Sequence, residues 1–306
     1  MTKDEYGQLL KEIAGGGDEV GAEAGRLRAE CEAQVLEKIL TTYWGLIVSG
    51  DAIHQFYMDL LRFYGKRLEK ASPLVIWFFH WHVLSSARYF AAFDLFKRGY
   101  YFESSSLART LWETSLTLCA LKRNVVTIEE VLGGQYKSGQ EVNQKEMKNR
   151  VRETDRRIQD ALIWKNTELT GEAIKAVSLF LNVMNLATHK THLGLAMNVK
   201  HAERGEPITL FPAFHAKRTE ASSNILHLAT WCLMATLSYM EGLMPEGGSD
   251  LDVRYHKVLF SFEELNKLPP NDLMRGMGEF TRKVLLGKTR KSPCQSEGAP
   301  EILTVC

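Results

Sequence analysis

The chain has 306 residues, and its 38 Lys and Arg residues nearly balance its 37 Asp and Glu residues, which gives a formal net charge of +1. Hydrophobic residues make up 45% and charged residues 25%, close to the averages of soluble globular proteins. The near-neutral balance argues against a dedicated nucleic-acid-binding protein, because such proteins usually carry a basic excess.

The five cysteines are scattered along the chain, and no two of them form a C-x-x-C pair. Such a set is typical of reduced thiols rather than of disulfides or of a zinc site. The first residues, MTKDEYGQLLKEIAGGG, lack the apolar stretch of a signal peptide. We therefore expect a cytoplasmic protein.

The N-terminal part, residues 1–25, is predicted to form a short helix and a flexible glycine-rich joint, AGGGDEVGAEAG. A helical bundle is predicted over residues 26–245, because no proline occurs between Pro73 and Pro207 and strand-type alternation is scarce. Helix start and stop signals then give the expected helices. They are 26–48, a helix capped by Asp51, 73–98, 103–123, 140–167, 171–200 and 216–243.

The C-terminal part, residues 246–306, is predicted to be an extension with one amphipathic segment, 252–268, and a disordered tail after about residue 287. Two apolar stretches, 74–96 and 225–240, are not expected to span a membrane. The first carries His, Arg and Asp side chains, and the second has only 16 residues. The predicted fold is therefore all-α, a single multi-helix bundle-like domain with a flexible C-terminal tail.

The segment 140–167 is highly charged and has its apolar residues on one side only. We favour a solvated outer helix with internal ion pairs. A nucleic-acid-binding face is the alternative, and five acidic residues in the same segment weigh against it. The alternative depends on six cations, Lys145, Lys148, Arg150, Arg152, Arg156 and Arg157.

The helix expected over residues 171–200 carries a narrow polar stripe. On a helical wheel, five of its side chains fall within less than a quarter-turn. They are Ser178, Asn182, Asn185, His189 and His192. A solvated helix face is normally broad and charged, whereas this stripe is uncharged at neutral pH and flanked by leucines. Because buried amides and imidazoles need partners, the polar stripe is predicted to face a polar site inside the protein.

His189 and His192 could share one metal ion, because residues three apart lie on one face of a helix. The sequence contains no H-E-x-x-H signature and no Glu-x-x-His pair, which disfavours a zinc protease and a ferritin-like di-iron site. We favour a hydrogen-bonded polar seam between helices over a metal site. No metal and no cofactor are therefore expected.

Arg109 and Glu113 stand four residues apart on a helix that is apolar on all sides. Such a helix is expected to be buried, so the two charges are predicted to form a buried pair. Because desolvation offsets the Coulomb attraction within a buried pair, stability alone explains this pair poorly. A structural role and a ligand-binding or orienting role are both kept as interpretations.

His80 and Asp94 lie close together on the wheel of the helix expected over 73–98, beside small residues that would allow another helix to approach. His82 points to the opposite side of this helix, beside Tyr89 and Phe93. We favour a hydrogen-bonded core histidine here. The alternative takes His80 and Asp94 as ligand-binding residues.

Two segments carry a resemblance to known proteins. The first, from Ala92 to Glu113, reads A-x-x-L-x-x-R-G-x-x-x-E-S-S-S-L-A-R-T-L-W-E, and the second reads N-L-A-T-H-K-T-H. Together they resemble the bacterial helical proteins of domain-of-unknown-function family 5677. The resemblance covers about residues 74–240 and implies a helical fold with a site at Arg109, Glu113 and His189.

A looser similarity links the chain to HEPN-type helical domains, many of which are metal-independent ribonucleases with an Arg and a His on one helix. In this chain Asn182 and Asn185 precede His189 where that Arg would be expected. Arg109 would have to supply the guanidinium group from a neighbouring helix. The two resemblances together imply a role in bacterial stress or phage defence.

We expect the helices that carry His80, Arg109–Glu113 and His189–His192 to converge on one buried polar pocket. The leading hypothesis is a ligand-binding or regulatory protein that takes a small molecule or RNA. Its expected ligand contacts are Asn182, Asn185, His192, His80 and Asp94.

The alternative is an HEPN-like ribonuclease. His189 would act as general acid or base, and Arg109, beside Glu113, would stabilise a pentacovalent phosphate. A metal-dependent hydrolase is the second alternative. DNA is not expected as a partner. The sequence leaves open whether the protein is an enzyme and whether it forms homo-oligomers.

Overall fold

The structure of the protein is a computed structural model. It describes residues 4–5, 18–133, 143–188, 214, 216–240, 249–255, 257 and 272–287. Every regular element among these residues is a helix, so the protein is all-α, as the sequence predicts. The predicted disordered tail after about residue 287 lies outside the described residues, as does most of the amphipathic segment 252–268.

The first long helix, α2 (Asp18–Gly65), runs through two places where the sequence predicts a break. The glycine-rich joint is predicted up to residue 25, but the chain is helical from Asp18 onward, although each glycine inside a helix costs about 1 kcal/mol. Asp51 caps no helix and instead pairs with Lys97 at 3.5 Å. The bend occurs at Tyr43, whose backbone is non-helical (φ −130°, ψ 29°).

The second long helix, α3 (Pro73–Lys97), begins and ends where the sequence predicts. The Ser72 hydroxyl accepts a hydrogen bond from the backbone N–H of Val75, and Pro73 occupies the first turn. The chain leaves the helix at Gly99, whose φ of 87° suits glycine. The short 3₁₀ turn η1 (Leu68–Lys70) connects α2 to this helix.

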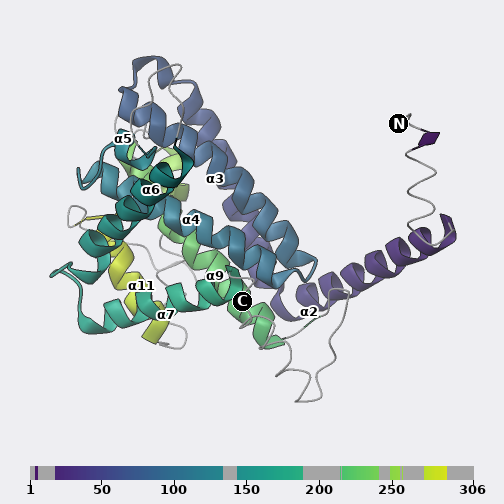
Figure 1. The fold of residues 1–306 in the computed structure, drawn as a ribbon. Helices are drawn as coiled ribbons and strands as arrows, with labels where there is room; N and C mark the ends of the chain where they lie inside the picture. Colours follow the sequence, from purple (N-terminus) through teal and green to yellow (C-terminus); the bar gives the residue numbers. More distant parts are fainter. Residues whose placement is uncertain are drawn as a thin grey trace, which may run out of the picture.

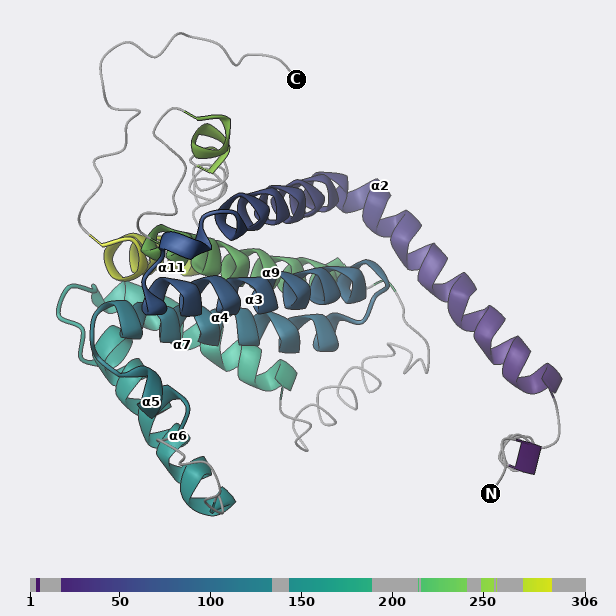
Figure 2. The ribbon, with the colours of Figure 1, turned by 90° about the horizontal axis from the view of Figure 1, so that it is seen from above.

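The helix α4 (Tyr101–Lys122) lies at the centre of the bundle. It packs against α3, α7 (Gly171–Thr188) and α9 (Ala216–Ala235), and η3 (Thr236–Tyr239) continues α9. Figure 2 shows α3, α4 and α9 side by side, with the N-terminal half of α2 projecting away from them. Large aromatic side chains fill the space between these helices. They include Phe56, Tyr64, Phe78, Tyr89, Phe96, Trp112, Phe180, Trp231 and Phe280.

The short α5 (Ile128–Val131) and the charged α6 (Gln144–Gln159) leave the bundle on another side (Figure 2). A π-helical turn, η2 (Asp160–Trp164), continues α6. Thr154 and Ile158 are buried, whereas the charged residues on the other side of α6 are exposed. The prediction of a one-sided outer helix is therefore confirmed.

One helix of the core has no counterpart among the predicted elements. It is α11 (Asp272–Phe280), which the π-helical turn η4 (Thr281–Leu285) continues, and it packs against α7 (Figure 1). Met277 and Phe280 are fully buried in the same core as the bundle residues. The sequence does not predict this helix, because it contains two glycines and follows a Pro-Pro pair, and both features normally indicate a loop.

Candidate functional site

The polar stripe of α7 does not face the core in the part of the helix that the structure describes. Asn182 is exposed, and Ser178 and Asn185 are half-buried. The opposite face is buried through Val177, Phe180 and Met184 and other apolar residues. These apolar side chains have a larger area to bury than the polar stripe, and their burial sets the orientation of α7. The predicted inward position is therefore wrong for Asn182. His189 and His192 lie outside the described residues.

The predicted pair between Arg109 and Glu113 is confirmed, with 2.7 Å between Nε and Oε1. The predicted burial of this pair is wrong, since the Arg109 side chain is 27% exposed and that of Glu113 is 51% exposed. The helix α4 buries the face that carries Ala108, Leu111 and Trp112, and this turns the pair outward.

A third charged residue, Asp155 of α6, adjoins this pair. Asp155 is exposed overall, but desolvation of its carboxyl group raises its pKa, and Glu113 raises it further. Arg109 opposes the rise. The three residues therefore form a mixed-charge cluster where α4 and α6 meet. Such a cluster can bind an anion through the guanidinium group or exchange a proton through the carboxyl group.

His80 and Asp94 do not form a common site. Fourteen residues separate them, which is about 21 Å along a helix, so their neighbouring wheel positions bring no contact. Asp94 pairs with Arg98 at 3.0 Å instead. His80 is exposed, and the prediction that it contributes to a buried pocket is wrong.

His82 is the fully buried histidine of α3. Its Nδ1 lies 2.5 Å from the Tyr57 hydroxyl of α2, and its Nε2 lies 3.3 Å from the Thr236 hydroxyl of η3. Because the Thr236 hydroxyl donates to the Leu233 carbonyl, its oxygen is free to accept a hydrogen bond from Nε2–H. Burial lowers the pKa of His82 to about 3, so the ring is neutral at pH 7.

His227 is a second buried histidine, and burial lowers its pKa to about 4. The sequence signal for both rings is their apolar surroundings. Phe78 and Phe79 precede His82, and leucines flank His227 on both sides. The nitrogens of the His82 ring contact side chains of other helices.

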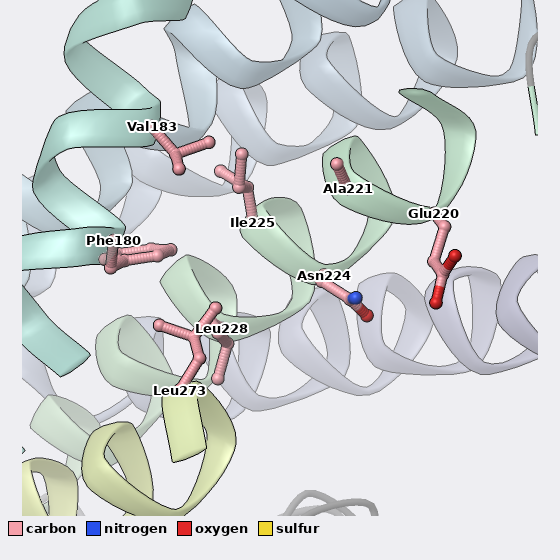
Figure 3. A pocket seen from close by; sticks show the side chains of 8 residues that line it. All are labelled: Phe180, Val183, Glu220, Ala221, Asn224, Ile225, Leu228 and Leu273. Atoms are coloured by element: carbon pink, nitrogen blue, oxygen red, sulfur yellow. The ribbon is translucent and has the colours of Figure 1, made fainter. Parts of the chain in front are cut away.

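An apolar recess of about 230 Å³ lies between α7, α9 and α11. Eight residues line it, namely Phe180, Val183, Glu220, Ala221, Asn224, Ile225, Leu228 and Leu273. Figure 3 shows the Glu220 carboxylate and the Asn224 amide on the same flank of α9, pointing away from Phe180 and Val183. The recess therefore combines an apolar floor with a polar rim.

The recess was not predicted from the sequence. Its residues come from three separate segments, and only the packing of α11 against α7 brings them together. None of the eight belongs to the predicted site residues. The recess also differs in kind from the expected polar pocket, because its floor is apolar.

Two features of the described residues concern metal binding and membranes. Within this part of the chain, no three His, Cys, Asp or Glu side chains gather as a set of metal ligands. None of the helices seen there combines the length and the apolar character that a membrane crossing requires.

Comparison with known proteins adds no assignment. No family model, no curated protein and no solved structure matches this chain. The resemblance to family 5677 and the similarity to HEPN-type domains therefore stay expectations from short motifs. Any function has to be argued from the geometry of the protein itself.

Proposed function

We propose that the protein binds a small amphipathic molecule in the recess between α7, α9 and α11. The observation that carries the proposal is the composition of the recess. Phe180, Ile225 and Leu228 form an apolar floor, and Glu220 and Asn224 supply a carboxylate and an amide at the rim. Ligand sites combine an apolar lining with a few polar groups that fix the orientation of the ligand.

The chemistry of the rim selects the ligand. Glu220 and Asn224 stand four residues apart on α9, so they lie on one face of the helix. A carboxylate with a neighbouring amide oxygen suits a cationic group that donates hydrogen bonds. The expected ligand therefore carries an aromatic or branched apolar group and an amine.

The size of the recess limits the ligand. Its volume of about 230 Å³ is below the range of about 300–1,000 Å³ that holds drug-sized molecules. A molecule with a single aromatic ring and a short amine chain fits the volume of the recess better than a nucleotide does. A regulatory role in stress or defence depends on the resemblance alone.

The experiment uses two probes of similar shape and opposite charge, phenethylamine and 3-phenylpropionate. We expect phenethylamine to raise the melting temperature of the full chain and to bind saturably in calorimetry, because ligand binding to the folded state stabilises it. Glu220→Gln should remove the preference for the amine, and Val183→Trp should fill the recess and abolish binding. Glu172→Gln, an exposed carboxylate of α7 outside the recess, is the matched control.

Two results would contradict the proposal. The first is equal binding of the amine and the carboxylate by the wild-type chain. The second is unchanged binding by a Val183→Trp variant that melts at the wild-type temperature.

A ribonuclease is the second candidate, and one observation favours it. The cluster of Arg109, Glu113 and Asp155 is accessible, and it joins a guanidinium group to a carboxyl group whose pKa is raised. The candidate predicts cleavage of RNA without added metal and loss of cleavage in Arg109→Gln, Asp155→Asn and His189→Ala. Intact RNA after incubation with the wild-type chain would end this reading.

A further inference from the structure

The outer side of α6 carries four exposed cations in a single line. They are Lys145, Lys148, Arg152 and Arg156, here named the basic stripe. At 3.6 residues per turn their side chains fall within about 80° of the helix circumference. The line extends over twelve residues, from Lys145 to Arg156, or about 16 Å along the helix axis.

The packing of α6 forces the basic stripe outward. Thr154 and Ile158 are buried on the opposite side of the helix, and Met147 and Val151 are half-buried there. Figure 2 shows α6 projecting from the bundle together with α5, so the outer side of α6 faces away from the other helices.

The charge on this side of α6 is not neutralised within the described part of the chain. Arg150 pairs with Glu146, and Arg157 pairs with Glu130, whereas none of the four stripe cations pairs with a described carboxylate. Six basic and three acidic residues give α6 a net charge of +3, although the whole chain carries only +1. The positive charge is therefore concentrated on one helix.

The acidic residues of α6 stand beside the basic stripe rather than within it. Glu146 and Glu153 lie on one flank of the helix, and Asp155 lies on the other flank, next to Glu113. Within the stripe itself the remaining side chain is the amide Gln159, while Asn149 borders one edge and Asp155 the other. The arc that carries the four cations therefore contains no carboxylate.

The lack of apolar side chains in the basic stripe indicates which class of partner it suits. A helix that lies on a membrane inserts Trp, Phe or Leu side chains beside its cations, and the basic stripe has none. Proteins that hold single strands stack the bases on aromatic side chains, and these are also missing from the stripe. A rigid line of cations with amides suits the fixed, closely spaced phosphates of a duplex.

We propose that the basic stripe of α6 binds the phosphate backbone of a nucleic-acid duplex. A duplex carries one negative charge per about 1.7 Å of its axis, so four cations spread over about 16 Å meet several phosphates at once. The contact needs neither the recess nor the cluster at Arg109. The excess of positive charge is a local property of α6, and the near-neutral net charge of the whole chain does not indicate it.

The test measures binding of the full chain to a fluorescein-labelled 20-base-pair RNA duplex and to a DNA duplex of the same sequence. Anisotropy is recorded between 50 and 200 mM salt. Four phosphate contacts predict a slope of log affinity against log salt of about −3.6, which is about a 100-fold loss of affinity over this range. Contacts to phosphates alone predict binding of both duplexes, so the DNA duplex also tests the expectation that DNA is not a partner.

The decisive variant replaces the four stripe cations together, as Lys145→Gln, Lys148→Gln, Arg152→Gln and Arg156→Gln. We expect it to lose at least 100-fold in affinity at 50 mM salt, with a helical content and melting temperature like those of the wild type. The matched control removes four exposed cations elsewhere, as Lys66→Gln, Lys70→Gln, Arg88→Gln and Lys175→Gln. It has the same net charge and should bind like the wild type.

Any one of the following outcomes would overturn the proposal that α6 binds a duplex. Absence of duplex binding by the wild-type chain at 50 mM salt would do so directly. Equal loss in the control variant would show a general charge effect rather than a site on α6. Competition by polyglutamate or by anionic phosphatidylserine vesicles at equal charge concentration would point to an acidic protein or a membrane instead.

Discussion

His82 connects three segments of the chain through one ring. Its two nitrogens contact Tyr57 of α2 and Thr236 of η3, and the ring itself belongs to α3. Protonation of the ring would place a positive charge in a fully buried position, and desolvation disfavours that charge. The acid sensitivity of the fold is therefore expected to depend in part on this residue.

The first prediction concerns pH. The pKa of His82 is about 3 in the folded state and 6.5 when the ring is exposed, so the unfolded state binds more protons between these values. The free energy of unfolding should therefore fall as the pH drops below 6.5. Because one group contributes at most about 1.4 kcal/mol per pH unit, His82→Gln should flatten the dependence between pH 4.5 and 6 by up to this amount. Urea unfolding at several pH values measures the slope.

Tyr57→Phe is the control for the first prediction. It removes the hydroxyl that contacts Nδ1 but leaves the imidazole buried. We expect a loss of about 1–3 kcal/mol at pH 7, because a buried nitrogen loses its partner, and we expect the wild-type slope. Identical slopes for the wild type and His82→Gln would contradict the assignment.

The contact between α7 and α11 depends on the absence of a side chain at Gly276. A Cβ atom there would lie 2.2 Å from the Ala176 Cβ, 3.1 Å from the Glu172 carbonyl oxygen and 3.2 Å from the Ala173 Cα. These atoms belong to a helix and cannot rotate away, so the two helices would have to separate. The same contact forms one wall of the recess, since Leu273 lies one turn before Gly276.

The second prediction is that Gly276→Ala destabilises the protein. Overpacking costs about 1–3 kcal/mol, and this exceeds the gain of about 1 kcal/mol in helix propensity. Ala176→Gly in the same chain should restore part of the loss, because it removes the nearest clash, and a double-mutant cycle measures the coupling. Gly45→Ala is the control, since no atom lies within 4 Å of the added Cβ, and it should be neutral or stabilising. Additive effects at Gly276 and Ala176 would refute the close approach.

At the scale of the whole molecule, local signals in the sequence predict the helices better than the way they pack. Ser72-Pro73 and Gly99 mark the ends of α3 correctly, because capping and positive φ are properties of a few neighbouring residues. The bend of α2 at Tyr43 and the helix α11 could not be predicted in this way. Both have contacts with residues that are distant in the sequence, since the centroid of the Tyr43 ring lies 6.3 Å from that of Phe214 and α11 packs against α7.

The candidate sites also have local features that the sequence predicts and an orientation that it does not. The Arg109–Glu113 pair is predictable from its i, i+4 spacing, but its exposure is set by which face of α4 meets the other helices. The wheel of α7 likewise identifies a polar face and leaves its direction open, and the predicted side is wrong for Asn182, which is exposed. The recess has no signal along the chain, since it requires α7, α9 and α11 to be packed together.

The last prediction concerns the C-terminal helix as part of the single core. Met277, Phe280, Val284 and Leu285 are at most 1% exposed, and burying each such side chain stabilises the fold by about 1.5–3 kcal/mol. Their combined contribution of about 6–12 kcal/mol is comparable with the total stability of a typical domain. A chain that stops after residue 271 should therefore lose its cooperative melting transition, whereas one that stops after residue 287 should melt like the full chain. Calorimetry of the two truncations checks this, and a cooperative transition in the shorter chain would show that the bundle is complete without α11.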